Sequence, residues 1–448
     1  MDNKAVELRE KIRQQFDTGP YPRTPLEISP KNDAKLLYIH NLVNPYYLRN
    51  KKVTETEGKL ILDAGCGTGY KSLVLASANP GAKIVGVDIS EKSVELARQR
   101  LHYHGFDNAE FYVSSIEDVP NLSLNFDYIN CDDVLYLFPD PAVGLQAMKS
   151  VLKPDGIIRA NLHSSLQRTF LYRAQEVFKL MGLMDENPKK LEIELVRDTM
   201  KALKDQVLLK AITWKPEFEF ETDEERILMN HLFQGDKGYT ITEMFSALRA
   251  AELEFVSMVN WQQWDLMALF KEPENLPVFL GMSLPETTVE EQLHLFELLN
   301  PVHRLLDFWC GYPNQGQSFV PVVEWTLSDW QEAQVHLLPQ LRTLELKEEL
   351  VRCIPQLIPF EISQQLAISE GAVFVDSTTA ACLLPLWEES QPMRLLVERW
   401  QKLRPVHPVS LQPTGAGEAL ELVRQARGLS SNGTVSNALG VQFSGQSS

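Results

Sequence analysis

A glycine-rich segment that directly follows an apolar run is the strongest chemical signal in the sequence. The segment Asp63-Ala-Gly-Cys-Gly-Thr-Gly69 comes after Leu60-Ile-Leu62, and helical spacing of apolar residues resumes at Lys71. Glycine allows a positive φ and a close approach of the backbone to a ligand. The first turn of a helix adds unpaired N–H donors. The pattern therefore predicts a ligand-binding loop between a buried strand and a helix.

The spacing of the glycines narrows the choice of ligand. A dinucleotide-binding loop has the pattern GxGxxG, whereas Gly65, Gly67 and Gly69 alternate with single residues. We therefore expect a loop that is not shaped for a pyrophosphate. A second apolar run, residues 84–87, ends in Asp88, whose carboxylate can accept hydrogen bonds from both hydroxyls of a ribose.

Together with the turn Leu152-Lys-Pro-Asp-Gly156, these segments resemble the motifs of class I S-adenosylmethionine-dependent methyltransferases. The resemblance covers residues 58–162 well and 240–260 loosely. It implies S-adenosylmethionine as cofactor, with the glycine loop beneath its methionine moiety. It also implies that Asp63 helps to hold the amino end of the cofactor and that Asp88 binds the ribose.

The adenine contact departs from the family pattern. Ile89 matches an apolar position that packs on adenine in the family, but Ser115 stands where an acid is common. Ser115, the backbone N–H of Ile116 and Glu117 remain alternatives for this contact. The predicted cofactor-binding residues are Asp63, Gly65, Cys66, Gly67, Gly69, Asp88, Ile89, Ser115, Ile116, Glu117 and Cys131.

Methyl transfer from such a cofactor is an in-line displacement that depends mainly on proximity and orientation. A base is needed when the acceptor arrives protonated. Asp132 or Asp133 is expected to accept a proton from an amine or to stabilise its charge, and the alternative is a helix cap. His163 is expected at the ligand face, and the alternative is a structural histidine. The predicted catalytic residues are Asp132, Asp133, Tyr136, His163 and Tyr21.

Tyr21 lies in a proline-rich N-terminal arm. Pro20, Pro22 and Pro25 favour an extended, stiff chain there. Many class I methyltransferases use such a segment as a lid over cofactor and acceptor. The alternative is an arm that its aromatic residues clamp to the core.

Short apolar runs alternate with segments of helical spacing, which predicts βαβ units and a parallel sheet. The expected fold is α/β: a Rossmann-like class I methyltransferase sheet with a helical insert, followed by a mostly α-helical C-terminal domain. In particular, residues 301–308 are expected to be helical. The predicted divisions are an N-terminal helical arm or lid at 1–57, a methyltransferase domain at 58–270 with a helical insert at 165–238, a mostly helical domain at 271–427, and a disordered tail at 428–448.

Composition excludes several classes of protein. The 43 Lys and Arg residues against 60 Asp and Glu give a net charge of −17, which disfavours nucleic-acid partners. The five cysteines form no CxxC pair, so neither a metal site nor a disulfide framework is expected. We also expect no membrane span and no signal peptide, and hence a cytoplasmic protein.

The layout of the chain resembles bacterial methyltransferases with a regulatory-type helical domain, among them protein-lysine methyltransferases. Weak patterns carry this likeness, such as Ile241-Thr-Glu-Met-Phe245 and Glu254-Phe-Val256. The resemblance implies a protein side chain, Lys or Asn, as methyl acceptor. The alternatives are a small-molecule methyltransferase with a helical substrate cover and a non-catalytic module that binds the cofactor. The helical additions are also a candidate surface for a homodimer.

Overall fold

The computed structural model describes residues 3–215, 224–316, 320, 324–337, 341–362, 374–407, 410–425 and 439–442. The chain divides into two compact units. The first comprises Met1–Ile28, Leu60–Leu73 and Ile84–Pro313, and the second comprises Ser29–Lys59, Val74–Lys83 and Asn314–Ser448. The segment expected as one N-terminal arm, 1–57, is therefore shared between the units.

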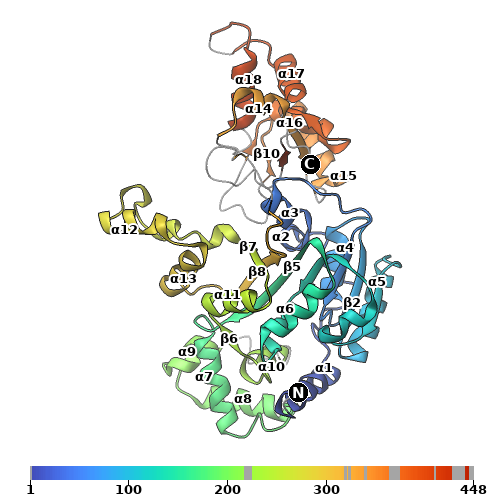
Figure 1. Ribbon diagram of the computed structural model, residues 1–448, viewed down its shortest axis with the longest axis vertical. Helices are drawn as coiled ribbons and strands as arrows, with labels where there is room; N and C mark the ends of the chain where they lie inside the picture. Colours follow the sequence, from blue (N-terminus) through green and yellow to red (C-terminus); the bar gives the residue numbers. More distant parts are fainter. Residues whose placement is uncertain are drawn as a thin grey trace. The chain divides into compact units, whose positions relative to one another are not determined.

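A mixed sheet forms the centre of the first unit (Figure 1). Within the described residues it has eight strands in the order β3-β2-β1-β4-β5-β8-β7, and β6 pairs with the end of β5. Strands β1 to β6 are parallel where they pair, whereas β8 is antiparallel to both β5 and β7. The strands are β1 (Leu60–Ala64), β2 (Lys83–Asp88), β3 (Glu110–Val113), β4 (Phe126–Cys131), β5 (Leu152–Ser164), β6 (Gly238–Tyr239), β7 (Glu254–Met258) and β8 (Leu305–Gly311).

Side-chain caps set the starts of the helices that pack on this sheet. Ser90 accepts a hydrogen bond from Ser93 N, Asp140 accepts one from Ala142 N, and Thr240 forms a capping box with Glu243. Packing of α1 against α5 and of α6 against α11 then encloses the core. These helices are α1 (Asn3–Thr18), α4 (Tyr70–Ala78), α5 (Glu91–Tyr103), α6 (Pro141–Ser150) and α11 (Ile241–Ala250).

Strand β8 corrects the sequence-based prediction. Residues 301–308 were expected to be helical, and the methyltransferase domain was expected to end at 270, but Leu305–Gly311 completes the sheet. A short run that is buried on both faces has no amphipathic period, so spacing alone does not distinguish strand from helix. Trp309 inside this strand is fully buried and donates a hydrogen bond to Tyr128 of β4.

Helices occupy the interval between β5 and β6 where an insert was expected. They are α7 (Thr169–Leu180), α8 (Lys190–Ala202), α9 (Leu208–Thr213) and α10 (Glu224–His231). They share a small core that contains Phe178, Val196, Met200 and Ile227. Between β7 and β8 the chain makes a second excursion, which contains α12 (Val278–Ser283) and α13 (Val289–Leu299).

The second unit is mostly helical but also contains strands. Its core includes Trp330, Val335 and Trp400, and its sheet has the order β12-β9-β13. Part of the tail that was expected to be disordered forms β13, which pairs with β9; residues 428–438 and 443–448 lie outside the described residues. The elements are α2 (Ala34–His40), α3 (Val43–Asn50), α14 (Leu327–Glu332), β9 (Gln334–Leu337), α15 (Leu344–Gln356), β10 (Phe360–Glu361), β11 (Phe374–Val375), α16 (Ser377–Leu383), β12 (Gln391–Pro392), α17 (Met393–Leu403), α18 (Ala416–Gln425) and β13 (Leu439–Gln442).

None of the helices in the described ranges combines the length and the apolar character that a membrane span needs. Nor do the described His, Cys, Asp and Glu residues form a group of three or more that could hold a metal ion.

Candidate functional site

The glycine loop folds over the carboxyl end of β2. The N–H groups of Gly65 and Cys66 both donate to Val87 O, at 2.8 and 2.9 Å. Gly65, Gly67 and Gly69 have φ values of +83°, +50° and +80°. This left-handed region is strained for residues with a Cβ, which explains the alternation of glycines.

The N-terminal arm lies directly on this loop. The N–H of Thr68 donates to Tyr21 O at 3.0 Å, and a Cβ at position 67 would come within 2.3 Å of the same oxygen. Thr68 Oγ1 also donates to Pro22 O at 2.7 Å. The glycine at 67 is therefore needed for the approach of the arm.

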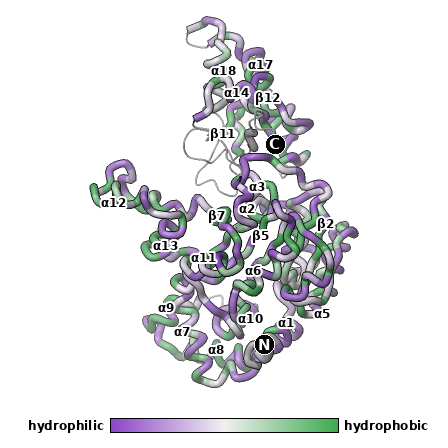
Figure 2. The backbone as a smooth tube through the Cα atoms, in the orientation of Figure 1, coloured by the Kyte–Doolittle hydropathy of each residue, from purple (hydrophilic) through white to green (hydrophobic). Residues whose placement is uncertain are grey.

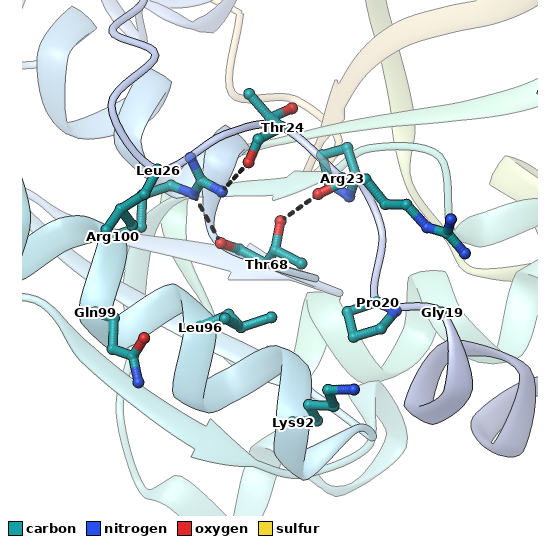
Figure 3. A pocket seen from close by; sticks show the side chains of 11 residues that line it. Gly19, Pro20, Arg23, Thr24, Leu26, Thr68, Lys92, Leu96, Gln99 and Arg100 are labelled. Atoms are coloured by element: carbon teal, nitrogen blue, oxygen red, sulfur yellow. Dashed lines mark hydrogen bonds between the residues drawn. The ribbon is translucent and has the colours of Figure 1, made fainter. Parts of the chain in front are cut away.

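Arg100 of α5 fixes the other end of the arm. Its guanidinium donates to the carbonyls of Thr24, Pro25 and Thr68 at 2.7, 2.9 and 3.0 Å. Figure 3 shows the hydrogen bonds to Thr24 and Thr68. The arm and α5 line an open cavity of about 380 Å³, and its lining contains none of the predicted cofactor residues. The arm is thus held on the loop and α5 through its backbone carbonyls, whereas the alternative to a lid supposed that aromatic side chains would hold it. Its part as a lid remains a prediction.

Asp63 is buried and holds three elements together. Its carboxylate accepts hydrogen bonds from Ser72 Oγ at 2.6 Å and from Asn130 Nδ2 at 2.9 Å, so it ties β1 to α4 and β4. Burial raises its pKa to about 6, although both donors act in the opposite direction. The observed contacts of Asp63 are structural, and its contact with the cofactor remains a prediction.

Asp88 presents a carboxylate at the end of β2. Its oxygens accept hydrogen bonds from Ser90 N at 2.9 Å and Gly67 N at 3.0 Å. Burial raises its pKa, against the effect of these two donors, and the nearby charge of Asp17 in α1 adds to the increase. The backbone N–H of Ile89 acts on this carboxylate as well. Because a carboxylate has about four acceptor positions, capacity for a ribose hydroxyl remains.

Two polar side chains at the end of α1 supply an independent test of fit for a cofactor. Within the described residues, both amide atoms of Gln15 and Oδ1 of Asp17 are buried and have no hydrogen-bond partner. Buried polar groups are rarely left without partners. Since the charge of Asp17 reaches Asp88, Oδ1 of Asp17 fits a polar ligand beside Asp88, and the amide of Gln15 is a further polar group in the same helix that has no partner in the described residues.

The predicted adenine contacts lie at the start of a short 3₁₀ helix, Ile116–Leu122. Ser115 is its N-cap: Oγ accepts from Asp118 N at 3.2 Å and donates to Asp118 Oδ2. The hydroxyl of Ser115 thus has a capping function, and Ile116 and Glu117 form the first turn. Ile89 is partly buried after β2, whereas the side chains of Cys66 and Cys131 are buried in the protein interior.

Asp132 is fully engaged by neighbouring side chains. Asn161 donates to its Oδ1 at 2.6 Å, and its Oδ2 lies 2.8 Å from Lys71 Nζ and 3.4 Å from Arg159 Nη1. Arg159 in turn pairs with Asp307 of β8 at 2.7 Å. The contacts of Asp132 therefore indicate a structural ion pair more than a catalytic base.

Asp133 follows Asp132 and is held in an unusual backbone conformation. Its φ is +58°, and its N–H donates to Asn161 Oδ1 at 2.9 Å. Its carboxylate is partly exposed and lies 3.3 Å from Arg304 Nη2. It caps no helix: the following short helix has Val134 at its N-cap without a side-chain hydrogen bond.

His163 has both ring nitrogens occupied. Nε2 lies 3.0 Å from Nη1 of Arg304 and must accept, because a guanidinium only donates. Nδ1 therefore carries the proton and donates to Asp236 Oδ1 at 2.6 Å. Burial lowers the pKa of His163 despite this carboxylate. The ring is neutral, and no lone pair is left for an acceptor.

Two tyrosines complete the group around Asp133. The ring of Tyr136 stacks on His163 with centroids 3.8 Å apart. Burial raises the pKa of Tyr136 well above its usual range and that of Tyr21 to about 12, and in both cases the charge of Asp133 contributes. Both phenols are therefore neutral, and the charge of this carboxylate acts on both.

The structure thus gathers four of the five predicted catalytic residues, Tyr21, Asp133, Tyr136 and His163, and places Asp132 behind them. Sequence reasoning missed Arg304 and Asn161. Asn161 stands two positions before His163 in β5 and therefore projects from the same face of the sheet, which was a usable signal. Arg304 directly precedes the strand that was expected to be a helix, so no sequence pattern placed it at the site.

The sheet order, the glycine loop after β1 and the acid at the end of β2 define a class I S-adenosylmethionine-dependent methyltransferase fold. Residues 55–243 match the family model described as a methyltransferase domain. The chain therefore contains a class I methyltransferase domain, and S-adenosylmethionine is the cofactor of this class.

Curated relatives match parts of the chain. The uncharacterized protein syc1184_c of Synechococcus sp. is 32% identical over 167 residues, which is 37% of this chain and 40% of that protein. The ubiquinone biosynthesis O-methyltransferase of Actinobacillus pleuropneumoniae is 32% identical over 145 residues, which is 31% of this chain and 59% of that protein. The chain thus spans less than two thirds of the length of either relative.

A solved structure resembles almost the whole chain. PKMT2 from Rickettsia typhi aligns with a TM-score of 0.55 and 15% identity over 93% of this chain and 76% of its own. PKMT2 in complex with AdoHcy gives the same TM-score and covers 91% of this chain. At this identity the similarity concerns the fold alone.

Proposed function

We propose that the protein transfers a methyl group from S-adenosylmethionine to a nitrogen of a protein side chain, with lysine preferred over asparagine. The observation that carries the proposal is the partly exposed carboxylate of Asp133, which lies 4.0 Å from Nε2 of His163, the ring on which Tyr136 stacks. The charge of Asp133 also acts on the neutral phenol of Tyr21. A carboxylate flanked by aromatic rings attracts an amine cation. An asparagine amide carries no charge and gains less from this group.

The cofactor supplies an activated methyl group on a sulfonium. In this proposal the glycine loop lies beneath the methionine moiety of the cofactor, and the carboxylate of Asp88 accepts hydrogen bonds from the ribose hydroxyls. A lysine ammonium has no free lone pair, so Asp133 first orients it and then accepts its proton. Arg304 fixes the direction of the Asp133 carboxylate through their ion pair. His163 holds the ring of Tyr136 by stacking on it.

The extent of structural similarity favours a protein acceptor. The similarity to the protein methyltransferase PKMT2 covers 93% of this chain. The match to the ubiquinone biosynthesis O-methyltransferase covers 31% of it, a share that accounts for a cofactor-binding core but not for the helical regions. That match is nevertheless the observation that favours a small-molecule acceptor as the second candidate.

The test is methyl transfer with S-adenosylmethionine that carries a radioactive methyl group. The full chain is incubated with native cell extract, and we expect label in a protein band and methyl-lysine in its mass spectrum. Label confined to small molecules would contradict the proposal, and methyl-asparagine would reassign the acceptor.

A matched pair of variants tests the site. Asp133→Asn should lower the labelling rate by about a hundredfold, the size typical for loss of a general base. Asp107→Asn removes an exposed carboxylate in the same unit and should leave the rate unchanged. Calorimetric affinity for the demethylated cofactor should be equal in both variants and the parent. Equal labelling rates in all three proteins would exclude Asp133 from the reaction.

A further inference from the structure

The excursion between β7 and β8 contains a short apolar helix, α12, that has no buried residue. Val278, Phe279 and Met282 of α12 are 78%, 77% and 73% exposed, and they lie at positions i, i+1 and i+4 of one helix. Figures 1 and 2 show α12 at the far end of the excursion. None of the short helical elements from Met267 to Glu286 contains a buried residue. Large apolar side chains in a contiguous exposed group mark interaction sites.

The base of this excursion, in contrast, is firmly anchored. Trp264 and Phe296 are buried, and His303 stacks on Trp264 with ring centroids 4.4 Å apart. Arg249 of α11 pairs with Glu290 at 2.6 Å. The exposed helix is therefore attached to a well-packed base. We call residues 271–286 the α12 tip.

Topology places the root of the excursion at the methyl-transfer site. Strands β5 and β7 are both antiparallel to β8 and so run in the same direction. The chain consequently leaves β7 at the edge of the sheet where β5 ends with His163. It returns through Arg304, which contacts both His163 and Asp133.

The charge around the apolar residues selects the chemistry of a partner. Within the α12 tip, Glu272, Glu274 and Glu286 are exposed, against a single cation, Lys271. An apolar face with an acidic rim is complementary to a segment that presents apolar and basic side chains together. A second copy of the α12 tip would bring like charges together.

We propose that the α12 tip is the docking surface for the protein acceptor, and that it binds an apolar segment flanked by lysines or arginines. The inference rests on the proposed function, since it assumes a protein acceptor. It assigns the excursion to recognition: the tip holds the acceptor while a lysine of that acceptor reaches Asp133.

The test uses the full chain and a short fluorescein-labelled peptide of leucine and lysine that forms an amphipathic helix. Fluorescence anisotropy should show binding, and replacing the leucines of the peptide by serine, or its lysines by glutamate, should abolish it. Phe279→Ser combined with Met282→Ser should weaken binding at least about tenfold. Leu180→Ser is the matched control, because Leu180 is 80% exposed in α7, and it should bind as the parent does.

A second variant tests the rim. Glu272→Gln, Glu274→Gln and Glu286→Gln together should weaken binding and reduce its salt dependence. Unchanged melting temperatures are expected throughout, since none of these side chains is buried. Equal peptide affinity of the Phe279/Met282 variant and the parent would overturn the proposal, and so would no binding by the parent.

Sedimentation distinguishes a protein acceptor from a second copy of this chain as the partner of the α12 tip. A parent that dimerises and a Phe279/Met282 variant that stays monomeric would assign the surface to a second copy and overturn the proposal. The two proposals can fail separately. If the Phe279/Met282 variant methylates a protein acceptor with the same KM as the parent, the docking surface is excluded but the proposed function still holds. Label confined to small molecules would exclude a protein acceptor, whether or not the peptide binds.

Discussion

Arg304 donates a hydrogen bond to Nε2 of His163 across 3.0 Å, and this bond decides what the histidine can do. The donor is always protonated, so the imidazole must accept at Nε2 and carry its proton at Nδ1. Asp236 receives that proton's hydrogen bond, and Arg168 and Gln175 hold Asp236 in turn at 2.7 and 2.9 Å. His163 therefore links the insert to β5 as a positioning residue.

The variant His163→Gln tests this assignment. A glutamine amide can accept from Arg304 and donate to Asp236, so we expect kcat to fall by no more than about fivefold, whereas loss of a general base costs roughly 10²–10⁴-fold. The pH profile of kcat should keep its shape, because no titration of His163 contributes to it. A large loss of kcat together with the disappearance of an inflection from the profile would restore His163 as a base.

Gly67→Ala tests the dependence of the cofactor site on the arm. The added Cβ would meet Tyr21 O at 2.3 Å, so we expect the arm to detach and the demethylated cofactor to bind at least about tenfold more weakly. Proteolysis within residues 19–26 should also become faster.

The control separates this effect from backbone strain. Gly105 has φ +82°, and a Cβ there meets nothing within 4 Å. Gly105→Ala should therefore share the loss of about 1–2 kcal/mol that a non-glycine residue incurs at positive φ but retain cofactor affinity. Equal affinities of the two variants would show that the arm does not support the site.

The sequence predicted well those parts of the molecule whose chemistry is local. The glycine loop, Asp88 and the alternation of strands and helices follow from turn geometry and from periodicity, and the cofactor fold was correctly recognised from them. Strand β8 was missed because its burial on both faces removes the period that would identify it. The methyltransferase domain was expected to end at residue 270 for the same reason, because β8 was not recognised as part of its sheet.

Side-chain partnerships across distant segments could not be predicted. Tyr21 was singled out from its place in the arm, but the effect of the Asp133 charge on its pKa depends on how residues 19–26 pack on the loop. Arg304 is 171 positions from Asp133 along the chain, and only the antiparallel return of β8 brings the two together. The choice between Asp132 and Asp133 likewise depends on Lys71 and Arg159, which no local pattern connects with them.

Gln15→Leu tests whether the polar atoms at the end of α1 face the cofactor. An apolar side chain of similar size removes two buried atoms that have no partner in the described residues, so the melting temperature of the cofactor-free protein should rise or stay equal. Affinity for the demethylated cofactor should fall at least about fivefold. Stability and affinity thus change in opposite directions, which a purely structural residue does not produce.

Gln14→Leu is the matched control, because Gln14 is the exposed neighbour in the same helix. It should change neither the melting temperature nor the affinity by a comparable amount. If Gln15→Leu lowers stability and leaves the affinity unchanged, the amide of Gln15 serves the packing of α1 instead.

His231 should make the stability of the insert depend on pH. It is fully buried against the rings of Phe178 and Trp214, and burial lowers its pKa to about 4. The unfolded chain binds a proton there near pH 6.5, so stability is constant above that pH and falls as the pH drops toward 4. At pH 5 the loss of stability is about 2 kcal/mol, since each unit of pKa shift corresponds to roughly 1.4 kcal/mol.

Urea unfolding of the parent and of His231→Phe at about pH 7.5 and pH 5 measures this loss of stability. The difference between the two pH values should be smaller in the variant by about 2 kcal/mol, and a uniform loss from repacking cancels in that comparison. Equal pH differences in the two proteins would mean that the ring is protonated in the folded state.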